Sequence, residues 1–459
     1  MLFNRRQILK SAAALTLLPL AARASNHVMV ASETIQQLAP EGFDKTRVWS
    51  FGGSVPGTAI RVEQGARVQR MVDNQLSVPT SVHWHGIRID NAMDGVPGVT
   101  QEAIPAGGSF EYDFVVPDAG TYWYHAHNRS VEQVARGLYG PLIVQEADAP
   151  DVDQDLVLML DDWRIDPETA QIADDFQKNG HDLSHAGRIG NLISVNGSFD
   201  PTIPVKRNER LRLRLINAAN ARIFDVGIQG LNGWIVALDG MPLENPVPIS
   251  ESFPLAPAQR ADLLVDVDAV SEETASLVSV ERDGAFGLAK FAVSGEISAT
   301  VRPAPNPLPP NRLPDVSSFQ SAPLHRMVLQ GGAMRWLENA RIGETELTGR
   351  ELAQLGRFWA LNGEAERPAE PFLKTSVDSI HRIEFVNETA FPHAMHLHGH
   401  HFRLVDGDGS LGPWRDTVLV DRGQTQQIVL MADNPGDWLL HCHMLGHAAS
   451  GMMSWFRVA

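Results

Sequence analysis

The residues that could do chemistry are histidines grouped in pairs one residue apart. Four such pairs that share no histidine occur: His83/His85, His125/His127, His396/His398 and His441/His443. On a β-strand, residues i and i+2 face the same side, so each pair can present two imidazoles together. With 17 histidines placed at random in 459 residues, fewer than one such pair is expected. Four pairs therefore indicate a metal site.

The only cysteine, Cys442, lies inside the last pair. In an extended segment its thiolate points away from the two flanking imidazoles, so one strand can offer sulfur to one metal and nitrogen to two others. His393, His447 and Met452 lie nearby in the sequence. A cysteine, two histidines and a weak thioether are the ligands of a blue-copper centre, because soft sulfur and imidazole suit both oxidation states of copper. Zinc is the rival for a Cys/His set, but it rarely needs eight further imidazoles and methionine binds it poorly.

The elements that must position these residues are predicted to be strands. Short runs rich in Val, Ile, Thr and aromatic residues, separated by Gly, Pro, Asn and Asp, predict an all-β chain of sandwiches or barrels. The segments Arg67–Val72 and Arg210–Ile216 alternate polar and apolar residues, as half-buried strands do. One short helix is predicted from Thr348 to Leu355, where Thr348 and Glu351 have capping-box spacing and Gly356 ends the turn.

The same outline occurs three times along the chain. Each copy has a Gly-containing turn and then a charged strand that ends in an asparagine: Asn74, Asn217 or Asn387. Nine residues later come His83 in the first copy and His396 in the third, but Val226 in the middle one. We therefore predict three β-sandwich domains with ligands only in the first and third, at residues 26–148, 149–300 and 315–459. The Pro-rich residues 301–314 are predicted to form a semi-rigid linker.

The N-terminus has the pattern of a targeting signal. A twin-arginine motif from Asn4 to Lys10 is followed by the apolar run Ala12–Ala22 and by Ala22-Arg23-Ala24, a small-x-small cleavage pattern. The run is too short to span a membrane, and no later stretch reaches about 18 uninterrupted apolar residues. We expect residues 1–25 to be a twin-arginine signal peptide, recognised by the twin-arginine translocation machinery. The mature protein is expected in the periplasm, without a membrane span.

The chain is acidic, with a formal net charge of −17 and an isoelectric point near 5.4. This balance argues against electrostatic binding of nucleic acid, which needs a basic surface. An acidic surface favours solubility and is compatible with a cationic substrate.

The histidine and cysteine motifs resemble those of the multicopper oxidases, which include laccases, ascorbate oxidase and bacterial cuprous oxidases. The resemblance covers nearly all of the mature chain. It implies three cupredoxin-like Greek-key domains with a trinuclear copper cluster between the first and third. The motifs that carry it are His83-Trp84-His85-Gly86, His125-Ala126-His127, the segment from His393 to Gly399, and His441-Cys442-His443 followed by His447 and Met452.

Carried over residue by residue, the resemblance implies four coppers per chain. The type 1 copper is expected at His393, Cys442 and His447, with Met452 as an axial ligand. The type 2 copper is expected at His83 and His396. The type 3 pair is expected at six further histidines: His85, His125, His127, His398, His441 and His443.

Three of these ligands and one acid are expected to take part in catalysis. His441, Cys442 and His443 would give a short covalent path for electrons from the type 1 copper to the cluster. Asp94, in Asp94-Gly95-Val96-Pro97-Gly98, resembles the acid of the family that relays protons. It is equally consistent with a turn aspartate at the start of a Gly/Pro loop. Many bacterial relatives have a glutamate just before the last type 1 histidine, where this chain has Gly446.

The resemblance implies an oxidase that takes single electrons from a reductant and reduces dioxygen to water. One candidate is a laccase-like oxidase of phenols or aromatic amines, of modest potential because its axial ligand is methionine. Another is a cuprous oxidase that takes Cu(I) in copper tolerance. Such enzymes commonly carry a Met-rich segment, and Met and Asp before the first type 1 histidine, where this chain has Thr389–Pro392. A third is a copper-storage or scaffold protein, against which the complete ligand set argues.

Several other histidines and one aspartate are expected to have smaller roles at the site. His400 and His401 are predicted to pack or hydrogen-bond behind the site. His181 and His185 fall in the polar stretch 174–188, which we predict to be an exposed loop in which substrate contact is the less favoured role. Asp416 is expected to be a structural acid or to support a ligand from behind.

Overall fold

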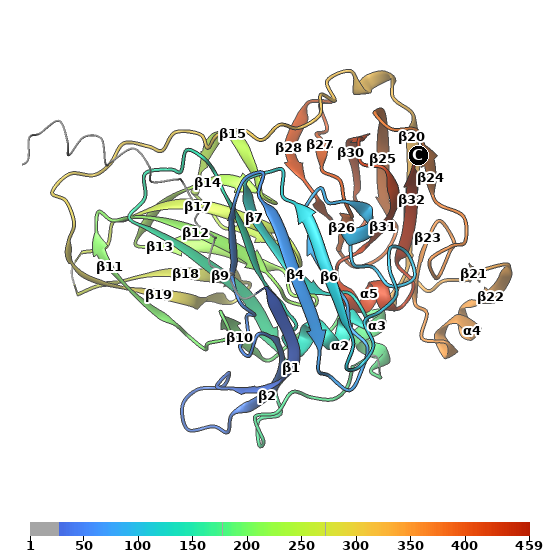
Figure 1. Cartoon of the computed structure of the whole chain (residues 1–459), viewed down its shortest axis with the longest axis horizontal. Coiled ribbons are helices and arrows are strands. Elements are labelled where there is room, and N and C mark those ends of the chain that lie inside the picture. Colours follow the sequence, from blue (N-terminus) through green and yellow to red (C-terminus); the bar gives the residue numbers. More distant parts are fainter. Residues whose placement is uncertain (1–26, 177, 271) are drawn as a thin grey trace, which may run out of the picture.

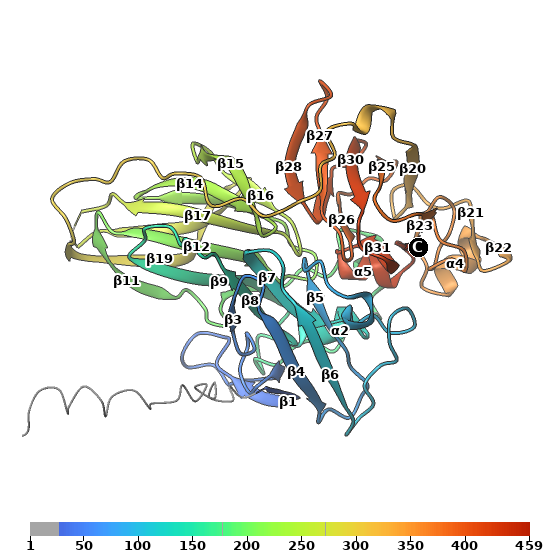
Figure 2. The ribbon, with the colours of Figure 1, turned by 45° about the horizontal axis from the view of Figure 1, so that its top comes forward.

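The computed structural model describes residues 27–459 except 177 and 271, and it is built almost entirely of β-strands, as predicted. The predicted signal peptide lies outside the described residues. Three β-sandwiches are arranged around a common junction, with the first and third side by side (Figures 1 and 2). In the part of the chain that is described, no helix is long and apolar enough to cross a membrane.

The first sandwich has two four-stranded sheets, with strand orders β2-β1-β4-β6 and β3-β8-β7-β5. Its connections contain the 3-10 helix η1 (Asn91–Met93) and the helix α2 (Ser130–Ala135). Its strands are β1 (Val28–Gln36), β2 (Thr46–Phe51), β3 (Ile60–Glu63), β4 (Arg67–Asn74), β5 (Val82–His85), β6 (Ser109–Val115), β7 (Gly120–Ala126) and β8 (Tyr139–Gln145).

The second sandwich pairs a six-stranded sheet, β10-β9-β12-β17-β14-β15, with a five-stranded sheet, β11-β19-β18-β13-β16. The short helix α3 (Gly180–Ser184) lies in the connection between its first two strands. Its strands are β9 (Gln154–Trp163), β10 (Leu192–Val195), β11 (Thr202–Arg207), β12 (Arg210–Asn217), β13 (Phe224–Gln229), β14 (Leu231–Leu238), β15 (Met241–Pro248), β16 (Phe253–Leu255), β17 (Arg260–Val267), β18 (Thr274–Glu281) and β19 (Gly284–Glu296).

The third sandwich has sheets of order β23-β20-β25-β30-β27-β28 and β24-β32-β31-β26-β29, with a β21-β22 hairpin. Its helices are η2 (Phe319–Ser321), α4 (Gly349–Gln354) and α5 (Leu445–Ala449). Its strands are β20 (Leu324–Gly331), β21 (Asn339–Ile342), β22 (Thr345–Thr348), β23 (Trp359–Leu361), β24 (Leu373–Thr375), β25 (Ser379–Asn387), β26 (His393–Leu397), β27 (Phe402–Val405), β28 (Leu411–Arg415), β29 (Thr417–Val420), β30 (Thr425–Ala432), β31 (Gly436–Cys442) and β32 (Met453–Val458).

The strands that carry the histidine motifs pair with each other in both outer domains. In the first domain β5 pairs with β7, so that His83 lies opposite His125. In the third domain β26 pairs with β31, so that His396 lies opposite His441. Antiparallel pairing therefore brings motifs that are far apart in the sequence into register on neighbouring strands.

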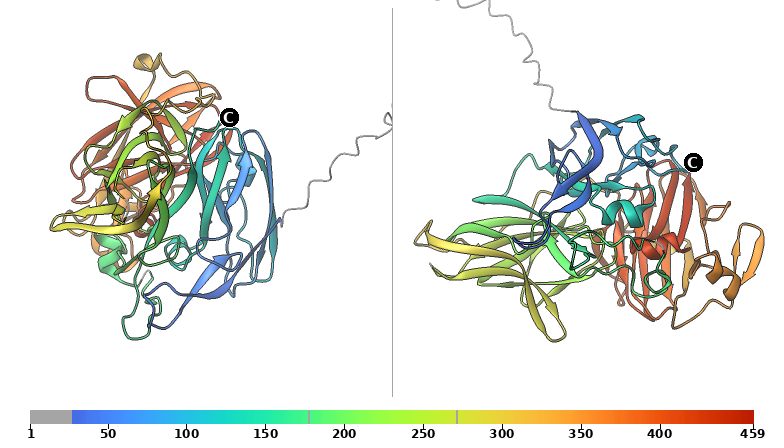
Figure 3. Two further views of the ribbon diagram at one scale, coloured as in Figure 1. Left: turned by 90° about the vertical axis from the view of Figure 1, so that its left-hand side faces the viewer. Right: turned by 90° about the horizontal axis from the view of Figure 1, so that it is seen from below.

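The hydrophobic cores explain how the motif strands of two domains come to face each other. One continuous core contains buried residues of both the first and the third domain, whereas the middle domain has its own core. A third group of buried residues, which includes Trp123, Trp163 and Leu445, joins all three domains. Figure 3 shows the three sandwiches from two further sides. Residues 301–314 contain no strand or helix, and within this segment the Asn311 amide donates to the carbonyl of Ala119 at 2.8 Å.

Two predictions about local structure had different outcomes. The predicted short helix is confirmed: α4 has Thr348 as its N-cap, with a complete capping box to Glu351. The prediction that Arg210–Ile216 is half-buried is wrong, because β12 is buried throughout. Its arginines point into the contact with the first domain and the linker, where Arg212 forms ion pairs with Glu146 and Asp262. Paired carboxylates make burial of such charges tolerable.

Candidate metal centre

Apart from the group His83/Asp94/His398, which includes a carboxylate, four groups of described side chains could each hold a metal ion, and together they contain all ten predicted histidines and the cysteine. Within each group one ligand atom per residue lies within 4.8 Å of the others. One group lies within the third domain, and the other three draw on both the first and the third domain. The groups are His393/Cys442/His447, His83/His85/His396, His85/His125/His443 and His127/His398/His441.

The group within the third domain combines sulfur and nitrogen. The Sγ atom of Cys442 lies 3.7 Å from Nδ1 of His393 and 3.7 Å from Nδ1 of His447, and these two nitrogens are 3.0 Å apart. The Nε2 atom of His393 lies 2.8 Å from the hydroxyl of Thr389, and that of His447 lies 2.7 Å from the carbonyl oxygen of His185. Because each Nε2 has an outer partner, both Nδ1 atoms are left to face the sulfur.

Met452 follows α5 and returns the chain to this site. Its carbonyl accepts from the Cys442 backbone N–H at 3.1 Å, and its own N–H donates to the carbonyl of His447 at 3.0 Å. The side chain of Met452 is fully buried. Trp359 covers the two imidazoles, with its ring centre 4.3 Å from that of His447 and 5.0 Å from that of His393. No motif in the sequence marks this tryptophan as part of the site.

The other three groups meet where the first domain faces the third. The rings of His85 and His396 stack at 3.8 Å between centres, and those of His83 and His398 lie 3.9 Å apart. His398 and His441 approach each other through their Nε2 atoms at 3.1 Å. Each sandwich therefore contributes about half of one compact set of imidazoles.

Backbone carbonyls orient two of these rings in the same way. Nδ1 of His83 lies 2.8 Å from the carbonyl oxygen of Asp94, and Nδ1 of His396 lies 2.9 Å from that of Asp416. The Nε2 atoms of both rings are buried and have no hydrogen-bond partner. Buried polar atoms are seldom left unpaired in native proteins. These two nitrogens therefore fit a metal ion held between the two domains.

Burial keeps the imidazoles in the neutral form that binds metals. It lowers the pKa of His441 and of His447 to about 4, and it lowers the pKa of His125 and of His398 further below the usual value. Burial also raises the pKa of the Cys442 thiol to about 12. Since a thiolate is the ligand, a metal that binds Cys442 must displace this proton. One thiolate beside neutral imidazoles is a donor set that suits copper.

Comparison with known proteins agrees with this donor set. Three family models described as multicopper oxidase match the chain, at residues 33–149, 154–278 and 343–459. The chain is 31% identical over 436 residues to "Multicopper oxidase MmcO" of Mycobacterium tuberculosis, covering 88% of this chain and 81% of that protein. This chain belongs to the multicopper oxidases. It is therefore a copper-dependent oxidoreductase, with cupredoxin-type domains, that oxidises reducing substrates with dioxygen.

Solved structures of this family resemble the whole molecule. Lac15 from a marine microbial metagenome is 42% identical with a TM-score of 0.77, covering 95% of this chain and 100% of that one. A multicopper oxidase from Pseudomonas thermotolerans is 29% identical with a TM-score of 0.82, covering 95% and 99%. Further relatives are named laccases or copper resistance protein A.

The predicted supporting residues lie where they can act on the ligands. Asp94 is fully buried, and its Oδ2 atom lies 2.9 Å from Nδ1 of His398. Asp416 is also fully buried, with Oδ1 3.2 Å from Nε2 of His85. His400 and His401 are buried behind the ligands, as predicted, and Nδ1 of His400 lies 3.2 Å from the carbonyl oxygen of His398.

The prediction of an exposed loop at residues 174–188 is wrong for part of that stretch. Leu183 and Arg188 are buried, and α3 packs beside α5 above the type 1 group. Arg164 anchors the stretch through ion pairs to Asp175 and Asp182, at 2.6 and 2.5 Å. Polar composition was misleading because these charges pair with each other. The His185 carbonyl was missed for another reason: a backbone acceptor leaves no mark on a sequence.

Proposed function

We propose that this multicopper oxidase is laccase-like, takes electrons one at a time from phenols or aromatic amines, and holds four coppers per chain. When bound, copper supplies the one-electron chemistry and the reduction of dioxygen to water. The chain supplies the ligands described above, a surface for the reductant and access for protons and dioxygen. The observation that carries the proposal is the aromatic surface above His447.

His447 is fully buried, so a reductant meets other residues first. The nearest is His185, whose carbonyl accepts the hydrogen bond from His447. The ring of His185 stacks on that of His181 at 3.9 Å and an interplanar angle of 12°, and His181 is exposed. Phe391 lies 5.8 Å from the His185 ring. Stacked rings suit a planar aromatic donor better than a small ion.

A neighbouring loop widens this surface. The backbone N–H of Ala333 donates to the carbonyl of Ser184 at 2.8 Å, which ties the loop to α3. The same loop presents Met334 and Trp336, which are 72% and 63% exposed. Large apolar side chains so exposed on a soluble protein often mark a binding surface.

Inside the protein, one strand joins the type 1 group to the cluster. The sulfur of Cys442 lies in the type 1 group, while the imidazoles of His441 and His443 lie in the two type 3 groups. An electron that reaches the sulfur therefore has covalent routes to both type 3 positions.

Asp94 is proposed to hold and pass protons at the cluster. Its Oδ1 atom is buried without a hydrogen-bond partner of its own, and it lies 3.2 Å from Nδ1 of His83, which already contacts the backbone carbonyl. A cleft of about 340 Å³ runs from the surface to His127 and His441, with Arg129 beside it. This cleft is proposed to admit dioxygen and to release water.

The second candidate is oxidation of Cu(I), and Met334 is the observation that favours it. Its exposed thioether is a soft ligand for Cu(I), and its loop is hydrogen-bonded to α3, the segment that carries His181 and is followed by His185. Some relatives carry the name copper resistance protein A. Because Met334 and Trp336 are separate exposed side chains of one loop, each can be substituted by itself to test one candidate.

The test measures oxygen uptake by the copper-loaded protein with a phenol or with Cu(I) as donor. We expect faster uptake with the phenol, and we expect Trp336→Ala to lower kcat/KM for the phenol roughly tenfold, which corresponds to about 1.4 kcal/mol of lost transition-state binding. Phe199→Ala, which removes another exposed aromatic side chain, serves as the matched control. Preference for Cu(I), together with a loss of Cu(I) oxidation in Met334→Leu, would favour the second candidate instead.

We also propose that the enzyme is exported to the periplasm by the twin-arginine machinery. The support is the motif from Asn4 to Lys10 with its apolar run and cleavage pattern. Replacing Arg5 and Arg6 by lysine should leave the protein in the cytoplasm, uncleaved. Cell fractionation checks this, and normal processing of the double variant would refute it.

A further inference from the structure

Asp416 contacts two ligands of the cluster at once. Its backbone carbonyl accepts from Nδ1 of His396 at 2.9 Å, and its Oδ1 atom lies 3.2 Å from Nε2 of His85. The hydroxyl of Thr417 donates to the same Oδ1 atom at 2.8 Å. Asp416 is fully buried, so its charge must be compensated within the protein.

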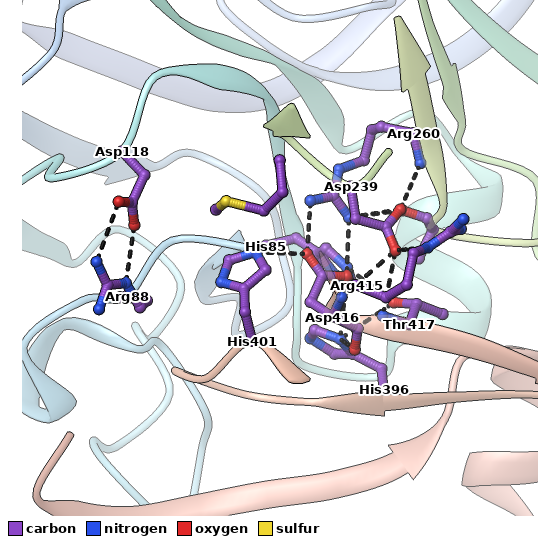
Figure 4. A network of polar contacts seen from close by, with 12 residues as sticks. His85, Arg88, Asp118, Asp239, Arg260, His396, His401, Arg415, Asp416 and Thr417 are labelled. Carbon is purple, nitrogen blue, oxygen red and sulfur yellow. Dashed lines mark hydrogen bonds and ion pairs between the residues drawn. The ribbon is translucent and has the colours of Figure 1, made fainter. Parts of the chain in front are cut away.

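The compensating charge comes from the middle domain, which holds no copper ligand. Arg260 begins β17 and is fully buried. Its Nη1 and Nη2 atoms donate to Oδ1 and Oδ2 of Asp416 at 2.9 and 2.5 Å, as Figure 4 shows. Its Nε atom donates to the carbonyl of Thr121 in the first domain at 3.1 Å. One guanidinium therefore binds all three domains.

Arg260 is itself held in place on its other side. Asp239 accepts from the backbone N–H of Arg260 at 2.9 Å, and its second oxygen accepts from Nε of Arg415 at 2.7 Å (Figure 4). A bidentate guanidinium–carboxylate pair fixed on both sides has little freedom to turn. The oxygen that faces His85 is accordingly fixed in position.

His85 differs from its neighbours in the nitrogen that it turns toward the cluster. In five other ligands Nδ1 is occupied by a carbonyl or carboxylate oxygen, which leaves Nε2 for the metal: His83, His125, His396, His398 and His441. In His85 it is Nε2 that faces the carboxylate, and the buried Nδ1 has no partner. An ionised carboxylate only accepts hydrogen bonds, so the proton belongs on Nε2 and the lone pair on Nδ1.

We propose that Asp416 and Arg260 form a positioning pair, which holds His85 with its Nδ1 atom toward the copper cluster. The middle domain thereby sets the geometry of one type 3 position without contributing a ligand. The proposal goes beyond the proposed function, and it holds whichever reductant the enzyme uses.

The glycine that follows His85 gives independent steric support. A Cβ atom at Gly86 would lie 2.3 Å from Nη2 of Arg260 and 2.6 Å from Oδ2 of Asp416. Real Cβ atoms essentially never approach so closely, so a side chain at this position would force Arg260 or Asp416 to shift. Gly86 also has φ of +85°, which other residues rarely adopt.

The test compares Asp416→Asn with Asp266→Asn in the copper-loaded protein. Asp266 forms an equally close bidentate pair with Arg210, at 2.6 and 2.7 Å, within the middle domain that also supplies Arg260, but without contact to a ligand. The asparagine at 416 offers one acceptor oxygen, for which Arg260 and His85 compete. We expect 10- to 100-fold weaker retention of copper at one type 3 position, the usual effect of removing a carboxylate behind a ligand histidine.

Two readouts besides activity report on that position. The chelator concentration that removes the first copper should fall in Asp416→Asn but not in Asp266→Asn. The fraction of copper visible by electron paramagnetic resonance should rise, because a coupled copper pair is silent and a broken pair is not. The blue absorption of the type 1 copper should stay unchanged, which separates a positioning role from a general loss of structure.

Equal copper retention and equal spectra in the two asparagine variants would overturn the proposal. If Asp416→Asn does not accumulate as folded protein, Arg260→Lys decides, since lysine keeps the charge but cannot bind both oxygens in the same geometry. We expect a smaller change of the same kind in that variant. A type 3 spectrum identical to that of the unmodified enzyme would contradict the proposed role of Arg260.

Discussion

Asp94 in the first domain and Asp416 in the third make the same pair of contacts in different surroundings. Each accepts through its backbone carbonyl from a histidine of its own domain, His83 or His396, and through its carboxylate from a histidine of the other domain. The two aspartates thus join the outer domains reciprocally across the cluster. This symmetry follows the sequence repeat, in which His83 corresponds to His396.

The difference between the two carboxylates lies in their cationic partners. Arg260 binds both oxygens of Asp416. Over residues 27–459, apart from 177 and 271, no lysine or arginine forms an ion pair with Asp94, and its Oδ1 atom lacks a hydrogen-bond partner. The guanidinium occupies both oxygens of Asp416 and compensates its charge, whereas one oxygen of Asp94 has neither a cation nor a hydrogen-bond partner. On our proposals, the same contact geometry serves proton transfer at Asp94 and positioning at Asp416.

The largest expected effect distinguishes the two aspartates by activity. Asp94→Asn should lower turnover 100- to 10,000-fold, the usual contribution of a group that transfers protons, and should leave the copper content unchanged. Asp94→Glu should recover part of the rate. Steady-state oxygen uptake and metal analysis check this. Loss of copper in Asp94→Asn would mean that Asp94 positions a ligand as Asp416 does.

The next effect concerns stability. Asp416→Ala should lower the free energy of unfolding by about 3–5 kcal/mol, because it leaves the buried Arg260 without its partner. Asp94→Ala leaves no buried cation, so it should cost only about 1–3 kcal/mol for the hydrogen bonds lost at His398. Denaturant unfolding of the two metal-free variants measures the difference. Similar losses of unfolding free energy in the two variants would contradict the proposed difference in their cationic partners.

A smaller effect is expected at Gly86, where Arg260 and Asp416 lie against the backbone. Gly86→Ala should destabilise the enzyme by about 1–3 kcal/mol through strain at positive φ and should displace Arg260 from Asp416. Gly107→Ala is a suitable control, since it has φ of +71° but open space around its Cβ position. Only the change at Gly86 should alter the type 3 spectrum. An unchanged type 3 spectrum in Gly86→Ala would show that Arg260 and Asp416 can shift without moving His85.

The smallest expected effect tests whether a hydrogen bond to the outer nitrogen of a ligand histidine also positions the type 1 group. Thr389→Val removes the hydroxyl that lies 2.8 Å from Nε2 of His393. We expect a loss of about 1 kcal/mol in stability and a small shift of the blue absorption band. Thermal unfolding and visible spectra check both. An unchanged band would mean that the packing of Trp359 alone fixes the ring.

The sequence allowed prediction of the features that depend on local periodicity. The His-x-His pairs and Cys442 could be assigned to opposite faces because side chains alternate along a strand, and the structure places all nine of these residues, together with His393 and His447, in metal-sized groups. Arg260 could not be predicted, since it lies 156 residues from Asp416 on a domain without ligands. The burial of β12 was missed for a related reason: its outer face is covered by another domain, which a strand pattern does not reveal.

The stretch around α3 has a practical consequence. It lies above His447 yet contributes only a backbone carbonyl to that residue, and Arg164 fixes it through two carboxylates of its own. If the surface above His447 selects the reductant, as we propose, donor preference is separated from the copper ligands and depends on this short surface segment. Replacing this segment while keeping Arg164 and its two carboxylate partners would change the preferred reductant and leave every copper ligand in place.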